Sequence, residues 1–248
     1  MTARAPAPRI RVKRLPERGH YDRETLTAIL DAGFVCAVGY IFDGHPYVTP
    51  TAYWRTGAHV YWHGSSASRM LRTVGAGVDV CLTVTHLDGF VLARSAFHHS
   101  LNYRSVMLFG RAERLDDPAA KTQALEAFVE RLFPGRWAEL RPVTPQELTA
   151  TTVLRMAITE GAAKIRTGPP KDDPADYAWP VWAGVLPVQG VLGAPIPDGQ
   201  VAPTIREPEY LANLTQFGFR PGPGTPLQDG NGREPGRSGR SQRGGASG

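Results

Sequence analysis

A run of serine and arginine residues near position 65 has the composition of an anion-binding site. The stretch Val60–Arg72, VYWHGSSASRMLR, passes from β-favouring residues through a small-residue loop into a predicted helix start. Its polar members are Ser65, Ser66, Ser68, Arg69 and Arg72. Serine is a good helix N-cap, and free N–H groups, hydroxyls and guanidinium groups together bind phosphate oxygens. The same pattern is also typical of an ordinary capped helix with two solvated arginines, so local reasoning leaves both interpretations open.

Three histidines are candidates for chemistry. His63 lies beside Gly64 in the same loop and is the one candidate for a catalytic role, as a phosphate contact, a substrate contact or a packed residue. His98 and His99 are adjacent, and adjacent residues of a strand point to opposite faces. The sequence therefore predicts no metal site.

The elements that must position these residues are mostly strands. A helix is predicted over 22–31, and Asp43-Gly44 is a strong hairpin signal. A second hairpin is predicted around Leu87-Asp88-Gly89, and Gly110 is the expected bulge of the strand after it. Predicted strands span 34–42, 47–54, 60–63, 78–85, 89–95, 103–115 and 151–159, and two further helices span 121–132 and the residues after Thr144. This order and spacing of strands and helices predicts a mainly β fold, a closed or nearly closed antiparallel barrel with flanking helices. No GxGxxG and no βαβ rhythm are present, which argues against a Rossmann domain.

Charge divides the chain into three regions. The net charge is +5, of which residues 1–19 carry +5 and residues 203–248 carry +2, leaving −2 for the body. We predict a basic irregular arm over 1–19, a folded domain over 20–202 and a Pro/Gly/Arg-rich, largely disordered tail over 203–248. The basic ends hold few aromatic residues, so a nucleic-acid partner is not expected.

The surroundings of the two cysteines indicate a reducing cellular compartment. Cys36 and Cys81 both lie in apolar runs, and their spacing resembles neither a disulfide framework nor a metal site. No apolar stretch approaches the length of a membrane span. We therefore expect a cytoplasmic protein with no membrane partner.

An aromatic, proline-rich segment follows Gly161. Trp179, Val181, Trp182 and the apolar residues after them are too hydrophobic for a solvated linker. This segment is predicted to pack on the barrel or on a second subunit.

Three motifs in this order carry a family resemblance. They are YWHGSSASRM, HHSLNYRSVMLFGRAERL, and KIRTGPPKDDPADY followed by PVWAGVLPV. Over about residues 18–190 the chain resembles the pyridoxamine 5'-phosphate oxidase-related flavoproteins, in particular their nitroimidazole-resistance (Nim)-like branch. The resemblance implies a split β-barrel, a six-stranded antiparallel Greek-key-like barrel, that forms a homodimer and binds FMN at the subunit interface.

The resemblance also implies roles for individual residues. Those placed near the FMN phosphate are His63, Ser65, Ser68 and Arg69. Those placed along the flavin ring are Pro50, Thr51, Ala52, Tyr53, Ser105 and Val106. Arg104 is placed close to the dimer seam, Lys171 lies in the third motif, and Trp182 would cover the ring from the partner chain.

The function implied by the resemblance is that of an FMN-dependent oxidoreductase. Nitroreductase-like electron or hydride transfer would pass from a nicotinamide donor to a small molecule. The alternative is a haem- or cofactor-binding split barrel without flavin turnover. The oxidases proper end in a Trp- and Arg-containing segment that binds the substrate phosphate, and the residues after Val188 contain no matching arginine. Vitamin B6 oxidase activity is therefore not expected.

Overall fold

The computed structural model describes residues 7–214 and 220–221. Its α-helices are α1 (Arg23–Asp31), α2 (Arg69–Gly75), α3 (Pro118–Leu132) and α4 (Pro145–Ala150). The strands are β1 (Gly19–His20), β2 (Val35–Phe42), β3 (His45–Thr56), β4 (His59–Ser65), β5 (Asp79–Leu92), β6 (Ser100–Arg111), β7 (Glu113–Arg114), β8 (Thr151–Ala157), β9 (Glu160–Arg166), β10 (Gly184–Pro187), β11 (Val191–Leu192) and β12 (Arg220–Pro221). Short 3-10 helices are η1 (Pro16–Arg18), η2 (Ala96–His98), η3 (Trp137–Glu139), η4 (Pro174–Ala178) and η5 (Glu209–Asn213).

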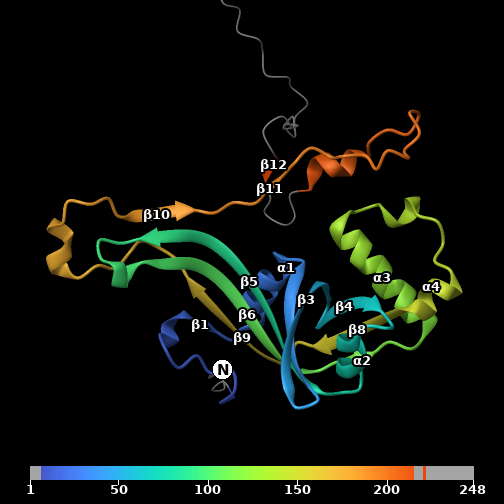
Figure 1. The fold of residues 1–248 in the computed structure, drawn as a ribbon, viewed down its shortest axis with the longest axis horizontal. Helices are drawn as coiled ribbons and strands as arrows, with labels where there is room; N and C mark the ends of the chain where they lie inside the picture. The colour runs from blue at the N-terminus through green and yellow to red at the C-terminus, as the bar shows by residue number, and fades with distance from the viewer. Residues whose placement is uncertain (1–6, 215–219, 222–248) are drawn as a thin grey trace, which may run out of the picture.

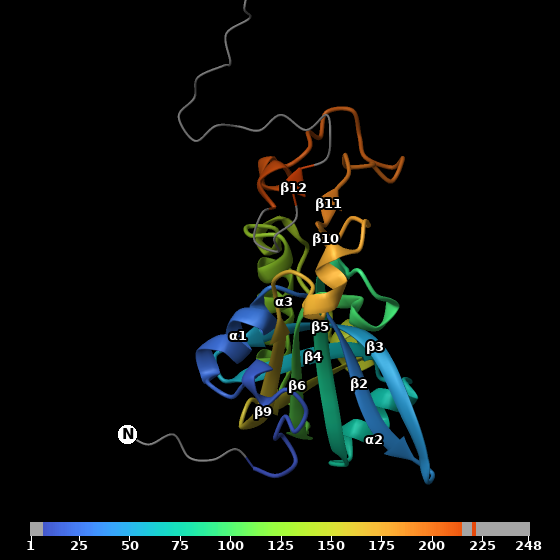
Figure 2. The same cartoon turned by 90° about the vertical axis from the view of Figure 1, so that its left-hand side faces the viewer.

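One antiparallel sheet organises the molecule. Its strands run in the order β1-β9-β6-β5-β2-β3-β4-β8-β7, and β10 pairs with the outer part of β5. In the part of the chain that the structure describes, β1 and β7 end this order without pairing with each other, so the sheet curls into an open split barrel (Figure 1). The predicted mainly β class is confirmed. In Figure 2, α1 lies at one side of the molecule and the β2–β3 hairpin, which is part of the sheet, lies at the other.

The core follows from the two-residue period of the strands. In β4, Val60 and Trp62 point inward and are fully buried, with Leu30 of α1 in the same cluster. The alternate residues of β4 point outward, where Trp54 and Val153 form a second cluster beneath α3. Helix α3 thus covers one outer face of the barrel and α1 contributes to its interior.

Side chains cap the starts of three helices. Asp22 accepts a hydrogen bond from the N–H of Thr25 at 2.7 Å, and Asp117 accepts one from the N–H of Ala120 at 2.8 Å. Thr144 and Glu147 form a capping box at the start of α4. Asp43 and Gly44 both have positive φ, as the predicted hairpin turn requires.

The predicted second hairpin is wrong. Residues 79–92 form the single strand β5, and Leu87-Asp88-Gly89 is a bulge within it. Strand β6 pairs along both sides of this bulge, and Asp88 uses its carboxylate to bind Arg104 instead of closing a turn. The chain reverses later, at η2. A local Asp-Gly signal was outweighed by pairing along a long neighbouring strand.

Two further strand predictions need correction. Strand β9 was missed, because its Gly-Ala-Ala sequence has low β propensity. Gly161 is needed there, since a Cβ would lie 2.5 Å from Leu108 Cδ2. Strand β6 continues through Gly110, and its break comes at Ala112.

Strands β5 and β6 extend beyond the barrel as a long arm, with η2 at its end and β10 along the outer part of β5 (Figure 1). No helix among the described residues is long and apolar enough to cross a membrane. Cys36 and Cys81 lie on the neighbouring strands β2 and β5, and both are free thiols. Of the predicted disordered tail, residues 215–219 and 222–248 lie outside the described residues.

Candidate functional site

The outward face of strands β3, β2, β5 and β6 is apolar and exposed. One row across it, given by the strand register, is Pro50, Ala37, Thr83 and Met107. Val48 lies opposite Gly39 in the next row and is 70% exposed, and Val35, Ile41 and Met107 are 53%, 55% and 44% exposed. A flat surface of small and aliphatic side chains has an unfavourable contact with water. The exposure of these side chains shows that the described part of the chain leaves this face of the barrel uncovered.

The predicted ring-lining strand divides between two faces. Pro50 and Ala52 belong to the exposed face, whereas Thr51 and Tyr53 point toward the interior. Tyr53 is fully buried, and its hydroxyl donates to the carbonyl of Leu30 at 2.5 Å. Burial raises the pKa of Tyr53 well above its ordinary value. Of these four residues, Pro50 and Ala52 are the two placed to meet a ligand on the exposed face.

Strand β6 divides in the same way. Ser105 lies on the exposed face between Thr85 and Lys164, and its hydroxyl donates to the Lys164 carbonyl at 3.3 Å. Val106 points inward and is fully buried in the core. Arg104 donates twice to Asp88, with Nη2 to Oδ1 at 2.8 Å and Nε to Oδ2 at 2.9 Å. Because both side chains are partly exposed, this ion pair contributes little to the free energy of folding. We infer that its role is to hold the bulge at Asp88 in position.

The serine and arginine loop lies at the end of the barrel. Ser68 accepts the N–H of Leu71 at 3.4 Å and so caps α2, and Ser65 accepts the N–H of Ala67 at 3.2 Å. The Arg69 guanidinium lies 4.3 Å from the ring centroid of Tyr47, on the inner side of the β2–β3 hairpin. Both hydroxyls can still donate their protons, and no carboxylate of the described chain pairs with Arg69. The loop therefore offers hydrogen-bond donors to an anion. Arg69, however, lies on the inner side of the β2–β3 hairpin, whereas Pro50 lies on the exposed outer face.

His63 packs beneath α3. Its ring centroid lies 4.8 Å from that of Phe128 and 5.6 Å from that of Trp54. Its Nδ1 is buried with no hydrogen-bond partner among the described residues, and burial lowers the pKa of the ring. Of the three roles considered for His63, this position favours the packed residue.

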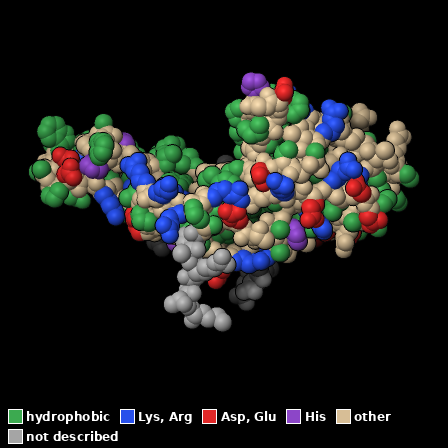
Figure 3. All heavy atoms as spheres, turned by 90° about the horizontal axis from the view of Figure 1, so that it is seen from below, with side chains coloured by type: hydrophobic (Ala, Val, Ile, Leu, Met, Phe, Trp, Pro, Cys, Tyr) green, Lys and Arg blue, Asp and Glu red, His purple; other side chains and the backbone are tan. Residues whose placement is uncertain are grey.

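The third motif lies against the end of the arm. Lys171 and Trp182 are exposed, and the Trp182 ring lies over Gly184, where a Cβ would be 2.8 Å from it. Trp179 and Trp182 are 67% and 66% exposed, so within one chain this segment does not bury its tryptophans on the barrel. The other predicted alternative, packing on a second subunit, stays a prediction. Hydrophobic side chains gather at this end of the molecule (Figure 3).

Two polar contacts that sequence reasoning missed hold the third motif in place. Asp172 has a fully buried side chain that accepts from the Arg94 N–H at 2.9 Å and from Arg94 Nη1 at 3.0 Å. Burial opposes ionisation of Asp172, but the hydrogen bonds from Arg94 outweigh it and lower its pKa. Arg166 is also buried and donates to the side-chain oxygen of Asn102. Only the polar character of these residues in otherwise strand-like runs could have indicated such contacts.

A groove lies on the arm beside β10. It has a volume of about 590 Å³ and is lined mainly by apolar side chains, with His99 at its edge. The lining residues are Phe90, Val91, Leu92, His99, Ser100, Leu101 and Leu186. Nδ1 of His99 lies 2.9 Å from the Ser95 carbonyl oxygen. When Nδ1 carries the proton and donates to that carbonyl, Nε2 keeps a free lone pair.

Comparison with known proteins gives consistent results. A family profile described as pyridoxamine 5'-phosphate oxidase matches residues 22–165. The flavocytochrome Anf3 from Azotobacter vinelandii is 48% identical, with a TM-score of 0.82 over 86% of this chain and 99% of that one. A FAD and heme binding protein from Mycobacterium smegmatis is 38% identical, with a TM-score of 0.76 over 79% of this chain and 97% of that one. A search of curated proteins found no match.

Proposed function

Because the chain belongs to the pyridoxamine 5'-phosphate oxidase family, we propose that it is a flavin-binding oxidoreductase that acts as a homodimer. The observation that carries this proposal is the exposed apolar face of β3, β2, β5 and β6. A flavin ring is flat and aromatic, and the small residues Ala37 and Gly39 leave room for such a ring to approach the sheet. A second copy of the chain would cover the rest of the face and exclude water from the ring.

The residues of the chain have binding roles in this proposal. Pro50 and Ala52 contact the ring, and Ser105 offers a hydroxyl at its edge. Arg69 and the serines of its loop lie on the other side of the β2–β3 hairpin, and in this proposal they offer donors to a phosphate that extends past the hairpin. Bound flavin supplies the electron or hydride transfer itself. No side chain of the described chain needs to act as an acid or base, and His63 is assigned a packing role.

The groove beside β10 is a candidate binding site for a second redox group. Two of the similar proteins are a flavocytochrome and a FAD and heme binding protein. An apolar groove with one histidine whose Nδ1 bonds a carbonyl oxygen fits a haem, because that hydrogen bond fixes the ring and leaves Nε2 for the iron. We therefore propose His99 as a haem ligand in a flavin- and haem-binding protein.

Absorption spectra of the purified protein test both proposals. We expect flavin bands, and chromatography of the released cofactor distinguishes FMN from FAD. After addition of haemin we expect a Soret band that the His99→Ala variant loses while it keeps its flavin. A colourless protein that takes up neither FMN nor FAD would refute the flavin proposal. An unchanged Soret band in the His99→Ala variant would refute the haem ligand alone.

Oxidoreductase activity needs its own measurement. The flavin-loaded protein is mixed with NADH or NADPH, and a nitroaromatic, a quinone or oxygen is the acceptor. Steady oxidation of the nicotinamide above that of free flavin supports turnover. Stoichiometric flavin binding without such oxidation would refute the proposed oxidoreductase activity and would indicate a protein that binds flavin without turnover.

A further inference from the structure

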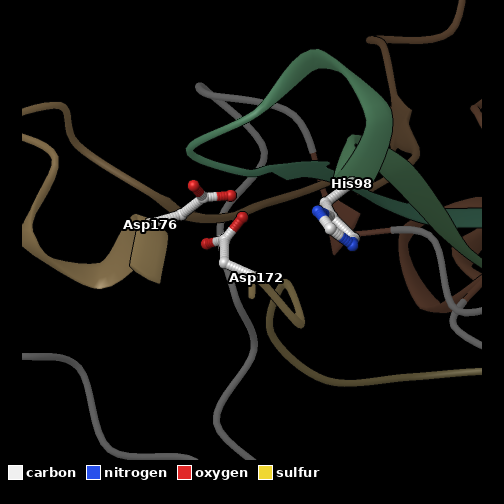
Figure 4. Close-up of side chains that lie close together, drawn as sticks. All are labelled: His98, Asp172 and Asp176. Carbon is white, nitrogen blue, oxygen red and sulfur yellow. The ribbon is translucent and has the colours of Figure 1, made fainter. Parts of the chain in front are cut away.

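We propose that His98, Asp172 and Asp176 form a binding site for a divalent first-row transition-metal ion at the end of the β5–β6 arm. His98 ends η2, Asp172 lies just before η4, and Asp176 lies within η4, so the site joins two segments that are distant in sequence. One ligand atom of each lies within 4.8 Å of the others. In Figure 4 the two carboxylates lie together and the His98 ring lies beside them.

The distances are close to those of a coordination sphere. Metal–nitrogen and metal–oxygen bonds of ~2.1 Å place tetrahedral ligand atoms ~3.4 Å apart. The widest separation of 4.8 Å therefore has to shrink by roughly 1.4 Å. Asp176 and His98 are both partly exposed, so rotation of their side chains can supply this movement without disturbing the sheet.

Two of the ligands are already oriented. The Ser95 hydroxyl lies 2.9 Å from His98 Nδ1, so a proton on Nδ1 leaves Nε2 free for an ion. Asp172 is held by the two hydrogen bonds from Arg94. Each carboxylate oxygen has two lone pairs, so an oxygen that accepts from Arg94 can still bind a metal.

The local charge favours a cation. Asp172 and Asp176 contribute two negative charges and Arg94 one positive charge, so these three side chains are negative overall. The Arg94 guanidinium also faces the ring of Tyr177, at 5.0 Å from its centroid. One imidazole with two carboxylates suits zinc, manganese or iron better than calcium or magnesium, which prefer oxygen ligands alone.

The site is separate from the proposed flavin face. Ser105 and Ser100 are five residues apart on β6, which is ~17 Å at ~3.4 Å per residue, and His98 lies beyond Ser100. A bound ion would join η4 to the end of the arm. It would thereby fix the segment that carries Trp179 and Trp182 and leads into β10.

Calorimetric titration of the untagged, chelator-treated full-length protein with zinc chloride tests the proposal. We expect one zinc ion per chain, and affinity at least ~10-fold weaker in His98→Ala and in Asp176→Asn. His45→Ala and Asp198→Asn are matched controls, because each removes the same type of side chain from an exposed position that is distant in sequence from all three ligands. Both should bind zinc as the wild type does.

Asp172 is left unchanged because its replacement would also remove the partner of Arg94. Far-ultraviolet circular dichroism and flavin content confirm that each variant is folded. Absence of stoichiometric zinc binding, or equal affinity in His98→Ala, would overturn the proposal. Since zinc binding is measured without turnover, its failure is distinct from failure of the flavin proposal.

Discussion

Replacing Val48 by aspartate should break the proposed homodimer while leaving the folded subunit intact. Val48 is 70% exposed in the single chain, so little of its burial energy contributes to folding. Complete burial of a valine side chain is worth about 1.5–3 kcal/mol, and 70% of that is about 1–2 kcal/mol per copy. A two-fold interface uses the residue twice, which gives about 2–4 kcal/mol per dimer.

This energy converts to a measurable change in association. At 1.4 kcal/mol per factor of ten, the dissociation constant of the dimer should increase roughly 30- to 700-fold. This is a lower limit, because the variant would also have to bury a carboxylate in the interface. Sedimentation velocity over a concentration series measures the change, and flavin titration should weaken in parallel. The melting temperature of the monomer should stay within the range of ordinary surface substitutions.

The control for this experiment is Leu140→Asp. Leu140 is 41% exposed in the segment after η3, which packs beside α3. This substitution makes a similar chemical change away from the proposed interface. If Val48→Asp and Leu140→Asp dimerise alike, the β3–β2–β5–β6 face is not the interface and the reasoning from its exposure is wrong.

Three further predictions concern single residues. Arg69→Ala should weaken flavin binding about 10-fold or more, as loss of a charge-assisted contact, while Arg72→Ala should not; equal affinities would exclude Arg69 from the phosphate site. Gly161→Ala should lower the free energy of unfolding by about 1–3 kcal/mol, because its Cβ would overlap Leu108, whereas Gly193→Ala, with nothing within 4 Å, should change it little in urea titrations. Burial lowers the pKa of His63 in the folded state, so protonation favours unfolding: the wild type should lose stability as the pH falls below about 6.5, and His63→Gln should lose less.

Local signals in the sequence were sufficient for much of the fold. The helix predicted over 22–31 and the turn at Asp43-Gly44 depend on neighbouring residues only, and the structure confirms both. The turn predicted at Asp88-Gly89 failed because it depends on the neighbouring strand β6, which pairs across it. Strand β9 was missed for a related reason, since its small residues are selected by close packing against Leu108 rather than by β propensity.

The site was harder to predict than the fold. Consecutive residues of a strand point to opposite faces of the sheet, so Ala52 and Ser105 lie on the exposed face whereas Tyr53 and Val106 are buried. A sequence motif that contains both residues of such a pair does not distinguish them. The group around His98 could not be found from spacing, because its two carboxylates are brought to it by the path of β9 and the loop after it. A contact between residues this distant in sequence leaves no periodic signal.

The late position of β10 has a consequence for synthesis of the chain. Strand β2 pairs with β5 only near its start, so the outer part of β5 has an open edge until β10 arrives. The β5–β6 hairpin is complete at residue 111 and β10 ends at residue 187, a delay of 76 residues. At ~5–20 residues per second, a ribosome needs roughly 4–15 s for this interval. During that time each nascent chain presents an unpaired hydrogen-bonding edge next to Phe90, which is a template for strand pairing with another chain.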